Sequence, residues 1–168
     1  MAVRKLIQVN TDGSRVEYAG KNTSTGAADA GEFIILDAAG KLNTSMLPNG
    51  VGADAITATA GEALNAGDFV YISPTGTVLK ADATAIAKSA RGYVIATVAS
   101  AALATVFFDE SNSAVTGLIA GATYYLSATP GQVTTTPPTI TGQIVQELGF
   151  ATSATNVHVN IQVPVIRA

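Results

Sequence analysis

Residues able to do acid–base or nucleophilic chemistry are few in this chain. It contains one histidine, His158, and no cysteine. Histidine is the side chain that titrates most readily near neutral pH, and a cysteine thiolate is a common nucleophile and zinc ligand. His158 falls between Asn156 and Asn160 on the polar side of an expected strand, which favours an ordinary exposed residue over a general base. We therefore expect neither a histidine-based triad nor a histidine- or cysteine-based metal site.

The acidic residues add little to this chemistry. Asp109 and Glu110, with the nearby Asn112, carry oxygen atoms of the kind that Ca²⁺ binds, but they follow a strand that ends at Phe108 and favour a solvated turn. The other acids are scattered singly, so no carboxylate pair of the glycosidase type is indicated. No glycine-rich segment has the Lys–Ser/Thr ending of a phosphate-binding loop. The sequence predicts a protein that is not an enzyme and that needs no cofactor.

The composition favours association with other protein surfaces. Of the 168 residues, 48% are hydrophobic but only 12% are charged, about half of the ~25% usual in soluble domains. A neutral surface rich in small apolar groups is poorly defended against association, so we expect a homo-oligomer.

Charge and hydropathy disfavour two other classes of partner. Residues 1–21 hold four bases against two acids, hence +2, whereas the remainder holds five bases against ten acids, hence −5. An acidic body without a basic patch argues against nucleic acid. The longest nearly apolar window, residues 93–108, is interrupted by Ser and Thr and is shorter than the ~20 residues of a membrane-spanning helix. Two adjacent strands explain this window better, so we expect no membrane partner.

A repeated phrase predicts how the chain is built. The same pattern occurs three times, with its glycine at Gly40, Gly76 and Gly131. In each case an aromatic or apolar run is followed by a polar break that contains the glycine, and an apolar residue follows two places after the glycine. Glycine accepts the positive φ that a tight hairpin turn imposes. The sequence therefore predicts an all-β protein, a small barrel or sandwich built from successive hairpins.

The expected strands lie at short intervals, separated by Gly, Pro, Asn and Ser. They cover residues 55–59, 68–73, 77–81, 91–98, 102–108, 122–127, 131–136, 143–151 and 156–163. In the last of them the alternation places Val157, Val159, Ile161 and Val163 on one buried face. The stretch 82–90 offers either a helical turn capped by Asp82 or a loop.

The N-terminal part of the chain, residues 1–52, has a different pattern. Residues 3–9 and 15–18 flank an Asn-Thr-Asp-Gly turn and form a plausible first hairpin. Residues 21–31 resemble a linker in composition, and a second break covers residues 43–52 around Pro48. We therefore expect an N-terminal β arm and linker over residues 1–52, and a barrel or sandwich domain over residues 53–168.

Adjacent aromatic pairs identify candidates for an interface between copies. Aromatic side chains inside strands usually belong to the core. Neighbours such as Phe107 and Phe108 must, however, point to opposite faces of a strand, so one of each pair lies in a second core or at an interface. The candidates are Phe107, Tyr124 and Tyr125. Pro137 and Pro138 cannot donate ladder hydrogen bonds and should end a strand at a sheet edge.

Several of these phrases together resemble a known family. Residues 20–31, followed by 34–48, are similar to the N-terminal part of tailed-phage virion proteins. The phrases that resemble accessory capsid domains lie at residues 62–70, 80–84, 125–131, 134–138, 146–149 and 152–155. The resemblance implies a capsid decoration protein, that is, a cement protein or head-fibre base. It would be made in the bacterial host cytoplasm and act on the virion, at the capsid surface.

The resemblance also implies partners. Proteins of this kind act as homotrimers on the major capsid protein, with an N-terminal arm that reaches onto the shell. Residues 3–9 have the length and alternation needed to add a strand to a shell sheet. The expected contact residues are Val3, Arg4, Lys5, Leu6, Ile7, Val9 and Arg15. The Gly40-Lys-Leu…Leu47-Pro phrase is also common in tail fibres, so the alternative is a tail-fibre or baseplate structural and adhesion module. A carbohydrate-binding adhesin would need an exposed aromatic platform.

Overall fold

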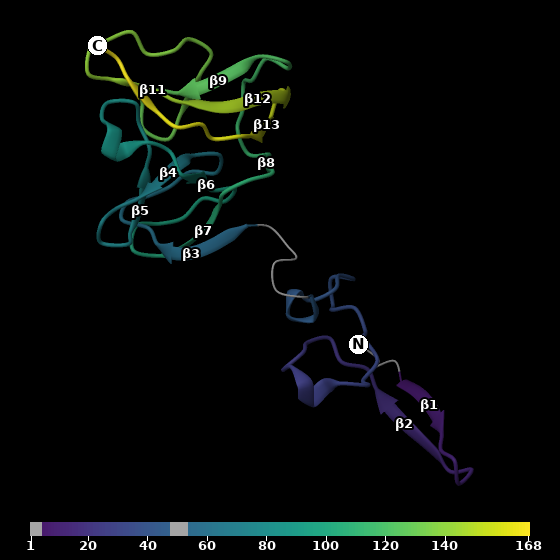
Figure 1. Ribbon diagram of the computed structural model, residues 1–168. Coiled ribbons are helices and arrows are strands. Elements are labelled where there is room, and N and C mark those ends of the chain that lie inside the picture. Colours follow the sequence, from purple (N-terminus) through teal and green to yellow (C-terminus); the bar gives the residue numbers. More distant parts are fainter. Residues whose placement is uncertain (1–4, 48–53) are drawn as a thin grey trace. The chain divides into compact units, whose positions relative to one another are not determined.

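The computed structural model describes residues 5–47 and 54–168, and the chain divides into two compact units, Met1–Gly52 and Ala53–Ala168 (Figure 1). The predicted all-β class is confirmed. The helical segments of the described residues are three single turns of 3-10 helix, η1 (Ala27–Asp29), η2 (Thr44–Met46) and η3 (Ile86–Lys88).

The N-terminal unit begins with a two-stranded antiparallel hairpin. Strands β1 (Lys5–Val9) and β2 (Arg15–Ala19) pair from Lys5 opposite Ala19 to Val9 opposite Arg15. The turn has the expected chemistry, because Gly13 takes a φ of 84° and the Asp12 carboxylate accepts a 2.9 Å hydrogen bond from the Ser14 amide. The stretch 21–31, expected to be a linker, contains η1. A parallel β-bridge pairs Lys21, at its start, with Ile34.

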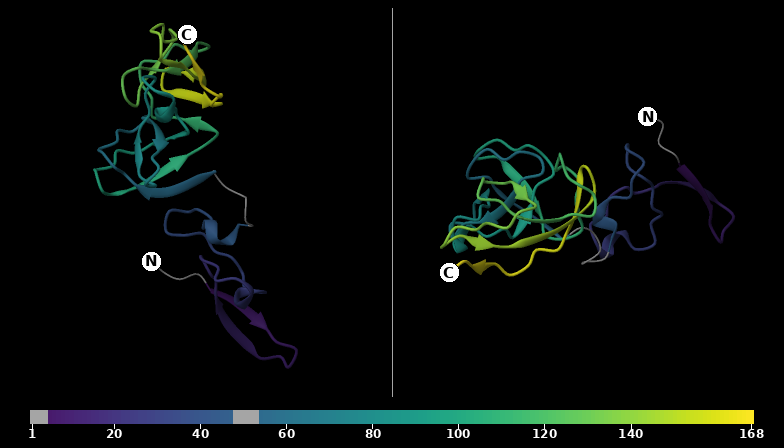
Figure 2. Two further views of the ribbon diagram at one scale, coloured as in Figure 1. Left: turned by 60° about the vertical axis from the view of Figure 1, so that its left-hand side comes forward. Right: turned by 90° about the horizontal axis from the view of Figure 1, so that it is seen from above.

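The C-terminal unit contains two five-stranded antiparallel sheets (Figure 2). The first sheet has the order β3-β7-β6-β4-β5, and its strands are β3 (Ala55–Thr59), β7 (Leu103–Phe107), β6 (Gly92–Tyr93), β4 (Phe69–Ile72) and β5 (Val78–Lys80). The second has the order β10-β9-β12-β13-β8, and its strands are β10 (Val133–Thr134), β9 (Thr123–Leu126), β12 (Glu147–Ser153), β13 (Asn156–Val159) and β8 (Ser111–Asn112). A short pair, β11 (Ile144–Val145) and β14 (Val165–Ile166), completes the unit.

Two apolar clusters form its core. The larger joins the sheets, since Phe69 and Tyr93 of the first sheet pack with Leu126, Leu148 and Val157 of the second. The smaller is a separate cluster of first-sheet and loop residues, among them Leu64, Val70, Val78, Val94 and Val106. After β3 the chain returns to β5, where Gly61 donates a 2.8 Å hydrogen bond to the Val78 carbonyl. The first sheet thus curls, and the two packed sheets agree with a sandwich rather than a closed barrel.

Three expected strand boundaries are wrong for identifiable reasons. The strand expected over 91–98 is only Gly92–Tyr93, because the chain leaves β4 after Val94 and its next paired residue, Val98, exchanges backbone hydrogen bonds with Leu64 instead. The strand expected over 143–151 is divided into β11 and β12 at Gln146, whose side chain is buried. The last strand ends at Val159 rather than residue 163, and Val163 is 86% exposed.

Two smaller expectations have mixed outcomes. The helical turn exists, but its N-cap is Ala85; Asp82 instead accepts a hydrogen bond from the Thr84 amide. Pro137 and Pro138 follow β10, which is an edge strand as predicted.

Candidate functional site

The hairpin β1–β2 displays apolar side chains on both of its faces. Residues directly opposite in an antiparallel pair share a face, so Leu6, Val16 and Tyr18 lie on one side and Ile7 and Val9 on the other. All ten residues of the two strands are exposed, with Ile7 at 64% and Val9 at 62%. A two-stranded hairpin without a packed layer is at best marginally stable in water. This surface is therefore suited to a partner that covers it.

Charged groups of the hairpin lie beside this apolar surface. Lys5 forms a 2.7 Å ion pair with Glu17 across the strands, and Arg15 begins β2. The pair is exposed and solvent-screened, so it contributes register more than stability. Of the expected contact residues, Val3 and Arg4 lie outside the described residues, while the structure brings the others together on this hairpin: Lys5, Leu6, Ile7, Val9 and Arg15.

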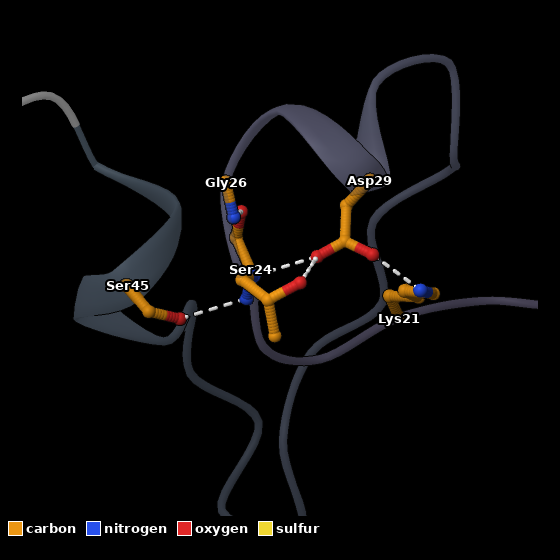
Figure 3. Close-up of polar contacts among 6 residues, drawn as sticks. Lys21, Ser24, Gly26, Asp29 and Ser45 are labelled. Atoms are coloured by element: carbon orange, nitrogen blue, oxygen red, sulfur yellow. Dashed lines mark hydrogen bonds and ion pairs between the residues drawn. The ribbon is translucent and has the colours of Figure 1, made fainter.

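A polar cluster organises the segment that follows the hairpin (Figure 3). Asp29, in η1, accepts hydrogen bonds from the Thr25 amide (2.6 Å) and hydroxyl (2.8 Å) and pairs with Lys21. The Ser45 hydroxyl, in η2, accepts a 2.9 Å hydrogen bond from the Ser24 amide. The Asp29 bonds join η1 to Lys21, just after the hairpin, and the Ser24 bond joins the turn before η1 to η2, so together they hold the segment in a compact form.

Electrostatics within the cluster are already balanced. The hydrogen bond from Lys21, with those from Thr25, lowers the pKa of Asp29 to about 2, and Asp29 in turn raises the pKa of Lys21. A cavity of about 140 Å³ lies beside the cluster, lined in part by Glu32, Phe33 and Met46. The Asp29 carboxylate is paired with the Lys21 ammonium group and hydrogen-bonded to Thr25, so the contacts of the cluster are structural.

The sequence interpretation missed this cluster. By composition alone, residues 21–31 are expected to be a linker of polar and small residues. The available signal was local: Thr25 and Asp29 have the spacing at which a carboxylate can accept from a preceding amide and hydroxyl. The partner Ser45 had no local signal, because it lies 21 residues from Ser24 in the sequence.

The chemistry-bearing residues of the C-terminal unit do not converge. His158 is exposed on β13, with its ring 5.3 Å from that of Phe150 on β12. Across the described part of the chain, no three His, Cys, Asp or Glu side chains gather as metal ligands would. Asp109 contributes its backbone carbonyl, which accepts a 2.7 Å bond from the Tyr93 hydroxyl. These positions offer no assembled catalytic or metal site.

Buried polar groups of this unit serve its loops. Asp68 is 1% exposed, accepts a 2.8 Å bond from the Asn65 amide and pairs with Lys80 at 3.2 Å. The Gln146 side chain bonds both the amide and the carbonyl of Ala90, at 2.8 and 3.0 Å. Both side chains hydrogen-bond backbone groups of loops, and those of Ala90 would otherwise be buried without partners, so their role is structural.

The three interface candidates have different environments. Phe107 is half-buried and stacks on Tyr93, with ring centroids 5.7 Å apart. Tyr124 is 5% exposed, belongs to the larger core cluster and accepts a 2.9 Å hydrogen bond from the Ile119 amide. Tyr125 is half-buried on β9. In the isolated chain, Tyr124 is thus a core residue, while Phe107 and Tyr125 keep some exposure.

Comparison with known proteins assigns no family. No protein-family model matches the chain, and no curated protein matches it. Among the described residues, helices are too short to cross a bilayer.

Proposed function

We propose that this chain is a structural protein of a tailed-phage particle, which binds the outside of an assembled capsid as a trimer and stabilises it. The observation that carries the proposal is the hairpin β1–β2, with apolar residues exposed on both faces and no buried residue in either strand. A surface of this kind costs free energy unless a partner covers it. The resemblance described above supplies the class of partner, the major capsid protein.

The physical reason for stabilisation is linkage. A protein that binds only the assembled shell shifts the assembly equilibrium toward that shell by mass action. Three hairpins in one trimer would bind with avidity, because the second and third contacts are intramolecular once the first has formed. Among the described residues, β1 and β2 form a sheet of two strands, so each can offer its outer edge to main-chain hydrogen bonds with a shell strand.

A point substitution tests the proposal with a matched control. Ile7→Asp places a charge on the hairpin, where Ile7 is 64% exposed, and Ile119→Asp places one on the C-terminal unit, where Ile119 is 67% exposed. We expect Ile7→Asp to abolish co-sedimentation with capsids that lack this protein, and Ile119→Asp to bind them as the wild type does. Capsid binding by Ile7→Asp equal to that of the wild type would refute the hairpin as the shell contact.

Electron cryomicroscopy of the particle tests the location. We expect three-fold protrusions on the head, with the N-terminal unit against the shell. Density at the baseplate or tail tip would instead assign the chain to the alternative class, a tail-fibre or baseplate module.

A further inference from the structure

An apolar groove lies beside β7 in the first sheet. It has a volume of about 510 Å³ and is lined on one side by the loop 95–99 and on the other by Ala102, Leu103, Thr105 and Phe107. Leu103 protrudes at its rim with 73% of its surface exposed, and Ile95 is 44% exposed. The same small area thus offers both an apolar hollow and an apolar protrusion.

The groove exists because β6 is too short to accompany β7. The Phe108 amide bonds the Asp54 carbonyl and the Ala60 amide bonds the Ala102 carbonyl, so even-numbered residues of β7 bond to β3. In an antiparallel ladder the odd-numbered residues then direct their N–H and C=O groups away from β3. Only Phe107 meets β6 there, opposite Tyr93. In the described structure, Leu103 and Thr105 have no hydrogen-bond partner on this side of β7.

The chemistry of the surroundings selects the occupant. Residues 92–108 contain no Asp, Glu, Lys or Arg, and neither do residues 55–61, which include the neighbouring strand β3. An uncharged surface offers nothing to a nucleic acid or an anionic membrane. It does suit a second copy of itself, since two identical neutral surfaces meet without like-charge repulsion.

Most other sheet edges of this unit are poorly suited to association. Strands β8 and β10 have two residues each, and β10 is followed by Pro137 and Pro138. Strand β5 is bridged by Ala60. Short, proline-flanked or covered edges resist pairing with another chain, so association is directed toward β7 and β3.

We propose that the groove between β7 and residues 95–99 is the surface through which copies of this chain associate. Leu103 of one copy enters the groove of the next, and the unpaired groups of Leu103 and Thr105 gain partners there. The inference rests on the proposed function in one respect, namely that the protein acts as several copies. It identifies Phe107, which lines the groove, as an interface residue.

Charge insertion at the rim tests this surface. Leu103→Lys changes an exposed side chain, so the fold should survive, and circular dichroism with thermal melting checks that it does. Ile119→Lys is the matched control, at 67% exposure and outside the groove. By sedimentation velocity we expect the wild type and Ile119→Lys to form the oligomer, and Leu103→Lys to self-associate roughly 100-fold more weakly.

Hydrogen exchange gives a second readout on the wild type itself. We expect the amides of Leu103 and Thr105 to be protected in the oligomer and to exchange freely at dilutions where it dissociates. An oligomer unchanged by Leu103→Lys, or a wild type that stays monomeric at tens of micromolar, would overturn the proposal. If Leu103→Lys forms the same oligomer but no longer binds capsids, the shell and not a second copy occupies the groove, and the proposal is overturned as well. Failure of wild-type capsid binding, measured separately, would count against the proposed function alone.

Discussion

The two units of this protein are ordered by different forces. In the C-terminal unit, Phe69, Leu64 and Leu126 are fully buried within apolar clusters. In residues 5–47, none of the side chains that the structure describes is buried. Order there comes from hydrogen bonds and ion pairs, such as those of Asp29 and the Lys5–Glu17 pair. Burial of apolar surface is the main source of folding free energy, so we expect the C-terminal unit to be stable alone and the N-terminal unit to gain stability from the partner proposed for it.

The contrast agrees with a division of labour. A unit that must recognise another surface keeps its apolar side chains outside, whereas a unit that must persist buries them. The same contrast predicts that substitutions of equal size have unequal consequences in the two units.

The largest effect is expected in the core that joins the two sheets. Phe69→Ala removes a ring with no exposed surface that packs against Tyr93 at a centroid distance of 6.0 Å. The loss of burial and the cavity left behind should cost about 3–5 kcal/mol. Chemical denaturation monitored by circular dichroism measures this. Leu6→Ala, on the exposed hairpin, should leave the main unfolding transition in place, and an equal loss for both variants would contradict the contrast.

A somewhat smaller effect is expected at Gly149 in β12, where the pairing of β12 with β9 is irregular between Glu147 and Gly149. Gly149 has a φ of 138°, and a Cβ there would lie 2.0 Å from the His158 carbonyl oxygen. Gly149→Ala should therefore cost roughly 3 kcal/mol. Gly76→Ala is the matched control, because Gly76 has a φ of 79° with nothing near its Cβ, and should cost about 1 kcal/mol. Similar melting temperatures for the two variants would show that the short distance between the added Cβ and the His158 carbonyl oxygen does not determine the loss of stability.

The N-terminal unit should respond to acid through Asp29. Its pKa is lowered to about 2 from an ordinary value of 3.8, so the folded state favours the ionised carboxylate. The resulting stability is fully present above pH 3.8 and is lost as pH falls toward 2. We expect the Thr25 amide resonance to shift through this window. In Asp29→Asn the shift should vanish, and a midpoint at the ordinary value in the wild type would exclude the lowered pKa.

The smallest effect is expected at the exposed ion pair of the hairpin. Glu17→Gln removes the charge that Lys5 meets at 2.7 Å, and both side chains are at least half exposed. Such pairs contribute about 0.2–1 kcal/mol. Amide exchange in β1 and β2 should accelerate slightly at low salt and hardly at all at high salt. A large acceleration would mean that this ion pair, and not contact with the proposed partner, controls the order of the hairpin.

Local chemistry made part of the fold predictable. The all-β class, the first hairpin and the edge position of β10 followed from alternation, from glycine-containing turns such as Asn10–Gly13, and from Pro137 and Pro138. These signals act over a few residues, so the sequence displays them directly. For the candidate site, alternation placed Leu6, Ile7 and Val9 together on one strand.

Contacts between distant residues were not predictable in this way. The strand expected over 91–98 stops at Tyr93 because Val98 pairs with Leu64, far back in the chain, and not with β4. Tyr124 and Tyr125 were equivalent in the sequence, and packing buried the first in the larger cluster. Neither outcome has a signal within a short window.

By itself, the sequence determined that this is an all-β chain with little charge and one histidine, because composition and turn chemistry are properties of neighbours along the chain. Only the tertiary structure decided that Asp29 joins Lys21 and Thr25, that the two sheets share one core, and that β7 has an open side lined by Leu103 and Phe107. Sheet order and burial are set by the total free energy of packing segments that lie far apart in the sequence. A pattern within a few neighbouring residues does not specify this total.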